Sequence, residues 1–372
     1  MSKIKNLKLI AVEVPLNKTF SGSKYKLDKR CTVITRIETD DGLVSEIYNG
    51  DNRTQTKEII KIINEELWPL VKDGDIFKSQ QLWEKMFIQV VPKHHEDYGI
   101  VMQAIACVDS AIWDLRGKAA GKNVAALLGG YHDELPMMGI CGYYIEGKTL
   151  GDIEKETDWI YNTAGLHAIK FKVGGLAPEE DVKRIAAARQ GAPKMTIAVD
   201  ANRGWDFLKA VKFAQLAEQY DIRWFEEPYY WFDDAYGMAR IKNKINIPIT
   251  SGQSEISGNG VKRMLEARAV DIVNFDASEA GGITEWQRVA GMCHFYGVQM
   301  AHHEEPQIAM QMLASVPHST YLECFPDPDR DPVWEKMVLN RPPLIDGKIK
   351  VMTDPGFGLK LDWDFIKKYQ VN

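Results

Sequence analysis

The stretch AIKFKVGG, residues 168–175, decides how the second half of this chain is expected to fold. Three apolar residues alternate in it with Lys170 and Lys172, and side chains two apart on a strand share one face. The stretch therefore predicts a β-strand with one apolar face and one face that carries two ammonium groups. Because a buried, unpaired ammonium group is costly, the lysines belong either to a functional site or to a solvated edge strand.

Eight apolar β segments of this kind recur from about residue 137 onward, separated by segments of helical periodicity. They cover residues 137–144, 168–173, 195–200, 223–227, 247–250, 270–276, 298–303 and 320–325. Alternating β and α segments predict a parallel sheet with crossover helices, and eight units favour a closed barrel over an open sheet. A Pro- and Asp-rich stretch follows the eighth strand where a last helix would be, so we expect an α/β fold with a modified (β/α)7β barrel.

The N-terminal part has a different pattern. Residues 6–15 and 31–48 alternate like strands, and residues 56–67 and 99–117 have helical periodicity. This part predicts a separate α+β domain. We expect that domain over residues 1–130, the barrel over residues 131–339, and a tail over residues 340–372 that returns to the first domain.

Composition narrows the classes of function. The chain has 372 residues, a net charge of −6 and a pI near 5.8, which gives no reason to expect nucleic acid or lipid as a partner. No stretch approaches the roughly 20 consecutive apolar residues of a membrane helix, and MSKIKNLKLI at the N-terminus lacks the apolar run of a secretory signal. The five scattered cysteines form no CxxC pair, so we expect a protein of the reducing cytoplasm.

Ionisable residues stand at or just beyond the ends of seven consecutive predicted strands. They are Lys170 and Lys172, Asp200, Glu226, Glu255, Asp276, His302 with His303 and Glu304, and Glu323. Any one of them could be a helix cap or a surface carboxylate. Barrel enzymes place their active sites at the carboxyl ends of the strands, so seven at equivalent ends predict a catalytic ring.

Three carboxylates on successive strands, Asp200, Glu226 and Glu255, suit a hard divalent cation such as Mg²⁺. Lys172 and His303, the latter paired with Asp276, are two candidate bases beside that metal. Such a site suits removal of a weakly acidic proton next to a carboxylate, with the metal stabilising the developing charge.

These motifs resemble those of the enolase superfamily, specifically its mandelate racemase group, over nearly the whole chain. The resemblance lies in Lys-x-Lys at 170–172, VDAN at 199–202, FEEP at 225–228, FDASEAGGITEWQRVA at 275–290 and MAHH at 300–303. It implies that the α+β domain, built from both ends of the chain, caps the barrel. It also implies one Mg²⁺ per subunit, a small carboxylate substrate, and homo-oligomers from dimers to octamers.

The resemblance also implies roles for individual residues. Lys172 and His303 are the expected acid/base catalysts, with Asp276 as the partner of His303. Lys170 and Glu323 are expected to bind the substrate carboxylate. Asn202, two residues past the first metal ligand Asp200, and His302, next to the catalytic histidine, complete the expected substrate contacts around these groups.

The third metal ligand departs from the family pattern. It normally follows a glycine directly, whereas Gly252 is followed by Gln253, and the glutamate comes two residues later at Glu255. We expect Glu255 to bind the metal, because a third negative ligand stabilises Mg²⁺ better than a neutral amide. The alternative is that Gln253 or a water completes the metal's ligands.

The implied first step is removal of the proton α to a carboxylate. Many members of the group are acid-sugar dehydratases, so we expect a mono- or diacid sugar to lose its β-hydroxyl and give a 2-keto-3-deoxy acid. The alternative is a racemase or epimerase of a 2-hydroxy acid, with Lys172 and His303 as opposed bases. Cycloisomerases and acylamino-acid racemases usually pair two lysines and fit less well, and a sugar-acid sensor would not need two bases beside a metal.

Substrate contacts from outside the barrel are expected in the loop near residues 16–27, at Phe20, Lys24 and Tyr25, and at Tyr143 at the end of the first barrel strand. For these residues a solvated loop is an equal alternative. HHEEP, at 302–306, is unusually polar for a strand-to-helix turn, and we expect it to contact distal hydroxyls of the substrate.

Overall fold

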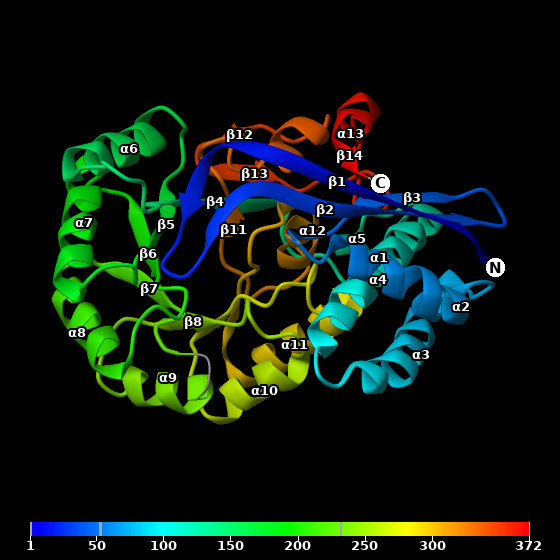
Figure 1. The fold of residues 1–372 in the computed structure, drawn as a ribbon, viewed down its shortest axis with the longest axis horizontal. Helices are drawn as coiled ribbons and strands as arrows, with labels where there is room; N and C mark the ends of the chain where they lie inside the picture. The colour runs from blue at the N-terminus through cyan, green and yellow to red at the C-terminus, as the bar shows by residue number, and fades with distance from the viewer. Residues whose placement is uncertain (1, 52–53, 231–232, 372) are drawn as a thin grey trace.

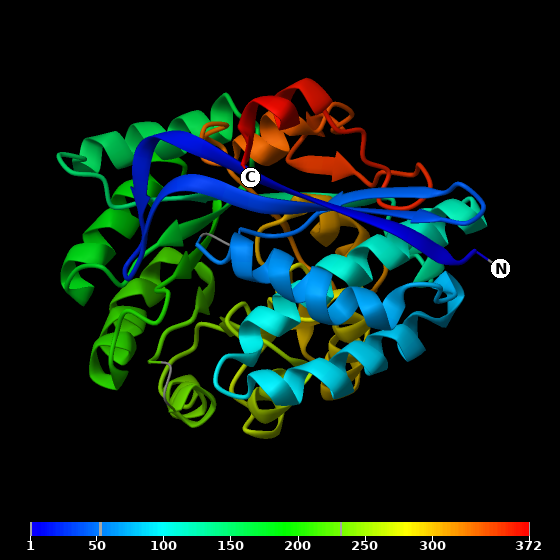
Figure 2. The same cartoon turned by 45° about the vertical axis from the view of Figure 1, so that its right-hand side comes forward.

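Two sheets organise the chain in the computed structural model, which describes residues 2–51, 54–230 and 233–371 (Figure 1). The first sheet has the strand order β14-β1-β2-β3, and all its pairs are antiparallel. Its strands are β1 (Ile4–Ser21), β2 (Lys26–Thr39), β3 (Val44–Tyr48) and β14 (Gln370–Val371). The long β1–β2 hairpin, blue in Figures 1 and 2, runs from the N-terminal helices across to the barrel, so its turn reaches the strand ends.

The helices of the N-terminal part pack on this sheet and on the barrel. They are α1 (Thr56–Ile62), η1 (Ile63–Leu67), α2 (Trp68–Val71), η2 (Ile76–Lys78), α3 (Ser79–Val90), η3 (Val91–His94), α4 (Tyr98–Ala120) and α5 (Val124–Leu127). Helix α4 ends at Gly121, whose left-handed backbone (φ 63°) closes the last turn. It is long and apolar enough to cross a membrane, although no such stretch was expected. Most of it is buried against β2, β3 and α11 (Gly282–Tyr296), so it is a core helix.

The second sheet is the predicted parallel barrel. In the part of the chain that is described, its eight strands are β4 (Glu134–Cys141), β5 (Ala168–Lys172), β6 (Thr196–Asp200), β7 (Ile222–Glu226), β8 (Ile249–Ser251), β9 (Ile272–Val273), β10 (Gln299–Met300) and β11 (Leu322–Cys324). Neighbours in the chain pair in parallel from β4 to β10, and β11 pairs with β4. Backbone hydrogen bonds between Met300 and residues 318–320 join the last strands, so the barrel closes.

One helix follows each barrel strand from β4 to β10. These helices are α6 (Leu150–Asn162), α7 (Pro178–Gly191), α8 (Phe207–Ala217) with the short η4 (Glu218–Tyr220), α9 (Asp234–Lys242), α10 (Gly258–Glu266), α11 and α12 (Pro306–Leu313). Strand β11 leads instead to the short helical segment η6 (Val333–Met337). This arrangement confirms the predicted fold class of a capping α+β domain and a (β/α)7β barrel.

The C-terminal tail contacts both sheets. It holds β12 (Leu344–Ile345), β13 (Lys348–Lys350) and α13 (Trp363–Tyr369) before β14. Strand β13 pairs with β4 on the barrel, whereas β14 pairs with β1 on the cap. The exact domain boundaries stay a prediction.

Burial explains which strand residues can be polar. The helix-facing side chains of the strands belong to the main apolar core, and a smaller cluster inside the barrel is formed by Met138, Ala168, Ala198, Trp224, Ile272 and Ala301. These residues fill the interior, as in other barrels whose interior is a packed core rather than a pore. Charged side chains occupy the next interior positions along β5, β6 and β7, toward the carboxyl ends of these strands.

Candidate active site

Strand register brings three charged residues into one layer of the barrel. Lys172 pairs with Asp200, and Asp200 pairs with Glu226, in the ladders β5–β6 and β6–β7. All three side chains are buried, and Lys172 Nζ lies 2.7 Å from Asp200 Oδ2. Burial alone would raise the pKa of Asp200, but the charges of Lys172 and Lys170 outweigh it and lower that pKa. The structure therefore keeps this carboxylate ionised.

Lys170 lies one layer deeper, and two carboxylates hold it. Its Nζ is 2.8 Å from Glu226 Oε1 and 2.5 Å from Glu323 Oε1, and all three side chains are almost fully buried. Burial raises the pKa of Glu226 to about 8, against the opposing charge of Lys170. Lys170, which shares the inner face of β5 with Lys172, is thus paired with the expected metal ligand Glu226 and the expected carboxylate binder Glu323.

Asp276 and His303 form the predicted dyad. His303 Nδ1 lies 3.0 Å from Asp276 Oδ2, while Asp276 Oδ1 accepts hydrogen bonds of 2.7 and 2.6 Å from the backbone N–H and hydroxyl of Ser278. These bonds fix the carboxylate, which in turn orients the imidazole. Burial would lower the pKa of His303, but Glu304 and Asp276 raise it to about 10. The resting imidazole is therefore a proton donor.

Lys172 and His303 line the same cavity of about 830 Å³ at the carboxyl ends of the strands. Asn202 also lines it, and its side chain accepts a hydrogen bond from Lys172 and donates one to Asp200. The hairpin turn between β1 and β2 covers the cavity: Ser23 Oγ donates to the carbonyl of Ala201 at 2.6 Å. Lys24 and Tyr25 line the cavity, and Lys172 Nζ lies 5.5 Å from the centre of the Tyr25 ring.

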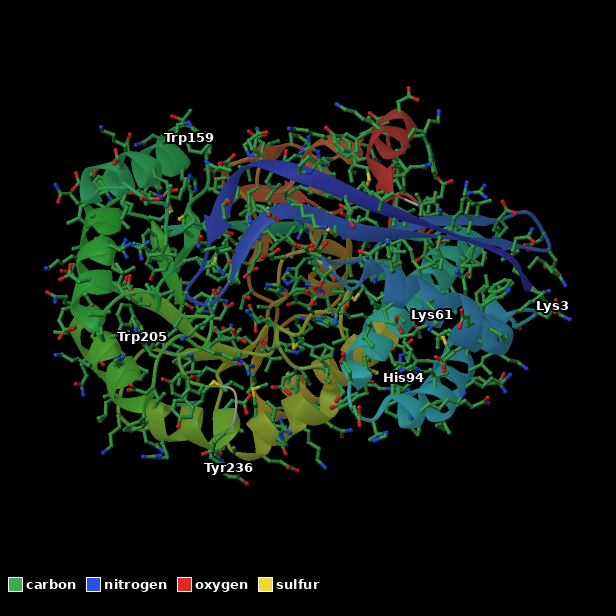
Figure 3. All side chains as sticks on the ribbon, in the orientation of Figure 1. Lys3, Lys61, His94, Trp159, Trp205 and Tyr236 are labelled. Atoms are coloured by element: carbon green, nitrogen blue, oxygen red, sulfur yellow. The ribbon has the colours of Figure 1, made fainter. Side chains whose placement is uncertain are left out.

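Phe20 and Tyr143 lie outside the cavity that contains Lys172 and His303. Their rings meet edge to face at 5.1 Å, and they line a second cavity of about 340 Å³ together with Trp159, which Figure 3 labels on α6. Tyr143 Oη accepts a hydrogen bond from Arg330 Nε at 3.2 Å. The structure does not bring Phe20 and Tyr143 to the wall of the cavity that contains the catalysts.

His302 does not face the cavity either. Its side chain is fully buried, Nε2 accepts from the backbone N–H of Ala277, and Nδ1 lies 2.9 Å from its neighbour's carbonyl. Both ring nitrogens are occupied, so this geometry leaves none for a substrate. His302 instead fixes the backbone that carries His303 and Asp276, and the expectation that it binds substrate is corrected.

Glu255 lines the main cavity, as Gln253 does, but its carboxylate contacts arginines rather than the other expected metal ligands. Its carboxylate is 3.5 Å from Arg263 and 3.9 Å from Arg203, and it packs against Gly260. Burial and the charge of Asp234 raise its pKa to about 7. Over residues 2–51, 54–230 and 233–371, no three His, Cys, Asp or Glu side chains form a group that could hold a metal. The three-carboxylate set is therefore not assembled.

Gln253 is the alternative third ligand, and neighbouring polar groups hold both its side chain and its backbone. Its Nε2 donates to Glu227 Oε2 at 3.0 Å, and its backbone N–H donates to Asn274. Gln253 lines the main cavity. Asp200 and Glu226 still supply two buried carboxylates of the oxygen chemistry that Mg²⁺ prefers, so the residues fit a hard cation with two acidic ligands and a neutral third position.

Several cavity residues were not identified from the sequence: Arg203, Glu227, Glu279 and Arg330. Glu227 follows Glu226 in FEEP, and Glu279 lies inside the strand-six signature, so motif position could have pointed to both. Arg330 carries no such signal, because it follows the eighth strand in an irregular stretch.

The backbone at this rim is unusual. Non-glycine residues with positive φ occur at Asn202 (42°), Arg203 (59°), Glu227 (41°), Glu304 (42°) and Glu305 (47°), each just beyond a strand end. Such conformations cost on the order of 1–3 kcal/mol each and persist where the surrounding structure over-determines them. The rim of the barrel is therefore built at a cost in stability, as expected of a functional site.

The raised pKa of His303 predicts a pH-dependent contribution to stability. The unfolded imidazole titrates near its ordinary pKa, whereas the folded one holds its proton to about pH 10. The stabilisation is therefore complete below about pH 6.5, and it is lost as the pH rises toward 10. In metal-free protein we expect the wild type to lose about 1–3 kcal/mol more than His303→Gln between pH 6 and pH 9.5, by urea unfolding. Parallel pH profiles would contradict this.

Comparisons with known proteins define the class. Residues 5–129 match the family described as mandelate racemase / muconate lactonizing enzyme, N-terminal domain, and residues 152–365 match the family described as enolase C-terminal domain-like. The chain belongs to the enolase superfamily, in the mandelate racemase/muconate lactonizing enzyme group. The resemblance drawn from the sequence motifs is confirmed.

Particular relatives narrow the chemistry of the class. The chain is 32% identical to an arabinonate dehydratase of Saccharolobus solfataricus, over 73% of this chain and 72% of the relative. It is 26% identical to a D-galactarolactone cycloisomerase of Agrobacterium fabrum, over 99% of each chain. A mandelate racemase/muconate lactonizing enzyme from a marine actinobacterium, solved in complex with magnesium, is 39% identical, with a TM-score of 0.92 and full coverage of both chains. Members of this group act on small carboxylates.

Proposed function

We propose that this chain is a Mg²⁺-dependent acid-sugar dehydratase. It removes the proton α to the substrate carboxylate and eliminates the β-hydroxyl, and the resulting enol tautomerises to a 2-keto-3-deoxy acid. The observation that carries the proposal is that Lys172 and His303 line one cavity directly above two buried carboxylates. The arabinonate dehydratase among the relatives supports the same reaction class.

The two catalysts are assigned different roles by the groups that surround them. His303, held as an imidazolium between Asp276 and Glu304, can protonate the departing hydroxyl so that it leaves as water. Lys172 is assigned to the α proton; burial would lower the pKa of its ammonium group, but its contact with Asp200 raises it, so it would act as a base once a bound cation had neutralised Asp200. Lys170 and Glu323 form a buried ion pair that does not line the cavity wall, and we assign them to the end of the site that would hold the substrate carboxylate.

The metal site follows from the donor set. Asp200 and Glu226 would hold the ion, and we place the third position at Gln253 rather than Glu255, because Glu255 is engaged by two arginines. A bound Mg²⁺ would supply positive charge to the substrate carboxylate as negative charge develops there. Similar enzymes crystallised with magnesium support the choice of ion.

A pair of substitutions tests the third ligand. Gln253→Glu adds a negative ligand to a site that has two, so Mg²⁺ should bind about tenfold more tightly or better. Glu255→Gln should leave the dissociation constant for Mg²⁺ within about threefold of the wild-type value, because in the wild type the Glu255 carboxylate contacts the arginines rather than the metal. Titration calorimetry on the metal-free proteins measures both. Loss of Mg²⁺ binding in Glu255→Gln with no gain in Gln253→Glu would restore Glu255 as the ligand.

A substrate screen in D₂O tests the reaction. We expect sugar acids incubated with the Mg²⁺-loaded protein to give 2-keto acids, detected by carbonyl derivatisation, with deuterium entering the product. Exchange at the α carbon without loss of water would favour the racemase or epimerase alternative. Isomerisation of a lactone without release of water would favour the chemistry named for the Agrobacterium relative. A blank over the whole library with Mg²⁺ bound would overturn the proposal.

A further inference from the structure

Glu304 and Arg330 form a charged pair in the wall of the cavity that contains both catalysts. Glu304 Oε1 lies 3.4 Å from Arg330 Nη2 and 3.6 Å from His303 Nε2. The pair therefore borders the catalytic imidazole on the side away from Asp276. A substrate that reaches His303 must pass this pair or contact it.

The position of Glu304 is held from two directions. Its backbone N–H donates to Glu323 Oε2 at 2.8 Å, which ties it to the residue expected to bind the substrate carboxylate. Its Oε2 lies 3.5 Å from Arg30 Nη1, on strand β2 of the capping domain. The backbone of Glu304 has a positive φ of 42°, a conformation that is costly for a residue other than glycine.

Arg330 offers an unused donor. The guanidinium is only 3% exposed; Nε donates to Tyr143, and Nη2 contacts Glu304. Nη1 is buried and has no hydrogen-bond partner among the described residues. A buried donor left unpaired costs on the order of 1–3 kcal/mol. Arg330 lies in the wall between the two cavities, so a ligand bound beside it is a candidate for the missing acceptor.

Glu304 offers unused acceptor capacity. An ionised carboxylate has about four acceptor sites, and the long contact with Arg330 is the one hydrogen bond that its oxygens accept from the described part of the chain. Burial would raise the pKa of Glu304, but Arg330, His303 and Arg30 lower it far below its ordinary value. The side chain is therefore an acceptor that carries a negative charge.

We propose that the Glu304–Arg330 pair reads hydroxyl groups at the far end of the substrate, and that the substrate class is accordingly a sugar monoacid rather than a diacid. An unpaired donor beside a carboxylate whose ion-pair contacts are all 3.4 Å or longer matches a hydroxyl group, which accepts and donates at once. The pair has no net charge, so it does not attract a second carboxylate, and Glu304 repels one. Arg30 does not change the net charge at the Glu304–Arg330 pair, because Arg30 is itself neutralised by ion pairs with Glu305 at 2.8 Å and Asp331 at 3.3 Å.

This inference rests on the proposed function, because it names the substrate of the same site. The HHEEP stretch was expected to contact distal hydroxyls, and Glu304 is the member of it that the structure brings to the cavity beside His303. The Glu304–Arg330 pair adds selection between sugar monoacids and sugar diacids, two classes of substrate with the same reacting carboxylate and α carbon. The choice is measurable as a ratio, which cancels any general loss of catalysis.

The test compares an aldonate with the aldarate of the same length and configuration. For the wild type with Mg²⁺, we expect kcat/KM to favour the aldonate by about 100-fold, as like charges held together cost several kcal/mol. Glu304→Gln removes the repulsion and should narrow the ratio about tenfold or more. Arg330→Gln leaves Glu304 unneutralised and should widen it, so the two variants move the ratio in opposite directions.

Glu46→Gln is the control. It removes one negative charge from a half-exposed side chain that pairs with Arg36 on the capping sheet, away from the cavity, so the ratio should stay within about threefold of wild type. A preference for the aldarate would overturn the inference and leave the dehydratase proposal intact. If that preference is lost in Lys24→Ala, the distal carboxylate belongs to Lys24. A protein that dehydrates neither class overturns the proposed function, and this inference with it.

Discussion

Lys172→Met is expected to reduce α-proton exchange and product formation by at least about 10³-fold while Mg²⁺ still binds. Lys172 lines the cavity and is only 2% exposed, and its Nζ contacts Asp200 and Asn202, which set its position. Methionine keeps the apolar stem and removes the amine. Because no other amine from strand β5 reaches the cavity wall, the α proton would have no base on this side.

The loss should show in single-turnover exchange in D₂O followed by NMR. Lys183→Met, on the exposed face of α7, is the control and should behave as wild type. Exchange that survives in Lys172→Met at more than a tenth of the wild-type rate would remove Lys172 from the mechanism. Loss of exchange in the Lys183 variant would point to misfolding rather than chemistry.

Arg30→Met is expected to destabilise the fold by about 3–5 kcal/mol, because it leaves buried carboxylates without their cation. Arg30 lies on β2 of the capping domain and is 3% exposed. Its guanidinium faces Glu304 and Glu305 after β10, Asp331 after β11, and Asp51. Burial opposes the charged form, but these four carboxylates raise the pKa of Arg30 well above its ordinary value.

Urea unfolding monitored by Trp fluorescence measures the effect. Arg36→Met is the control on the same strand: Arg36 pairs with Glu38 and Glu46 while about 30% exposed. A solvent-exposed pair contributes roughly 0–1 kcal/mol. Equal losses in the two variants would show that the buried cluster does not tie the cap to the barrel.

The barrel was predictable because its strands carry two signals at once. Apolar segments marked all eight strands, and ionisable residues marked the carboxyl ends of seven of them, so Lys172, Asp200 and Glu226 could be expected in one place. The register confirms that these three are neighbours. The dyad of Asp276 and His303 could be predicted from the family motifs in the same way.

The rest depended on contacts between distant segments. Glu255 was expected to join Asp200 and Glu226; it does reach the cavity, but its carboxylate lies near Arg203 and Arg263, from two other elements. Arg330 reaches the site from an irregular stretch whose course is set by tertiary packing on Phe325 and Tyr143. Contacts between distant segments cannot be predicted from the local periodicity of the sequence. The positive φ of a glutamate cannot be predicted from a strand or helix pattern either.

The left-handed residues at the barrel rim have a consequence for engineering. Glycine adopts positive φ without the steric penalty that other residues incur, so Glu227→Gly or Glu304→Gly would relax the backbone there. Laboratory selection for heat resistance alone would favour such changes, although stabilising changes at strained sites tend to reduce function. Libraries built to make this enzyme more robust should therefore hold residues 202–203, 227 and 304–305 constant.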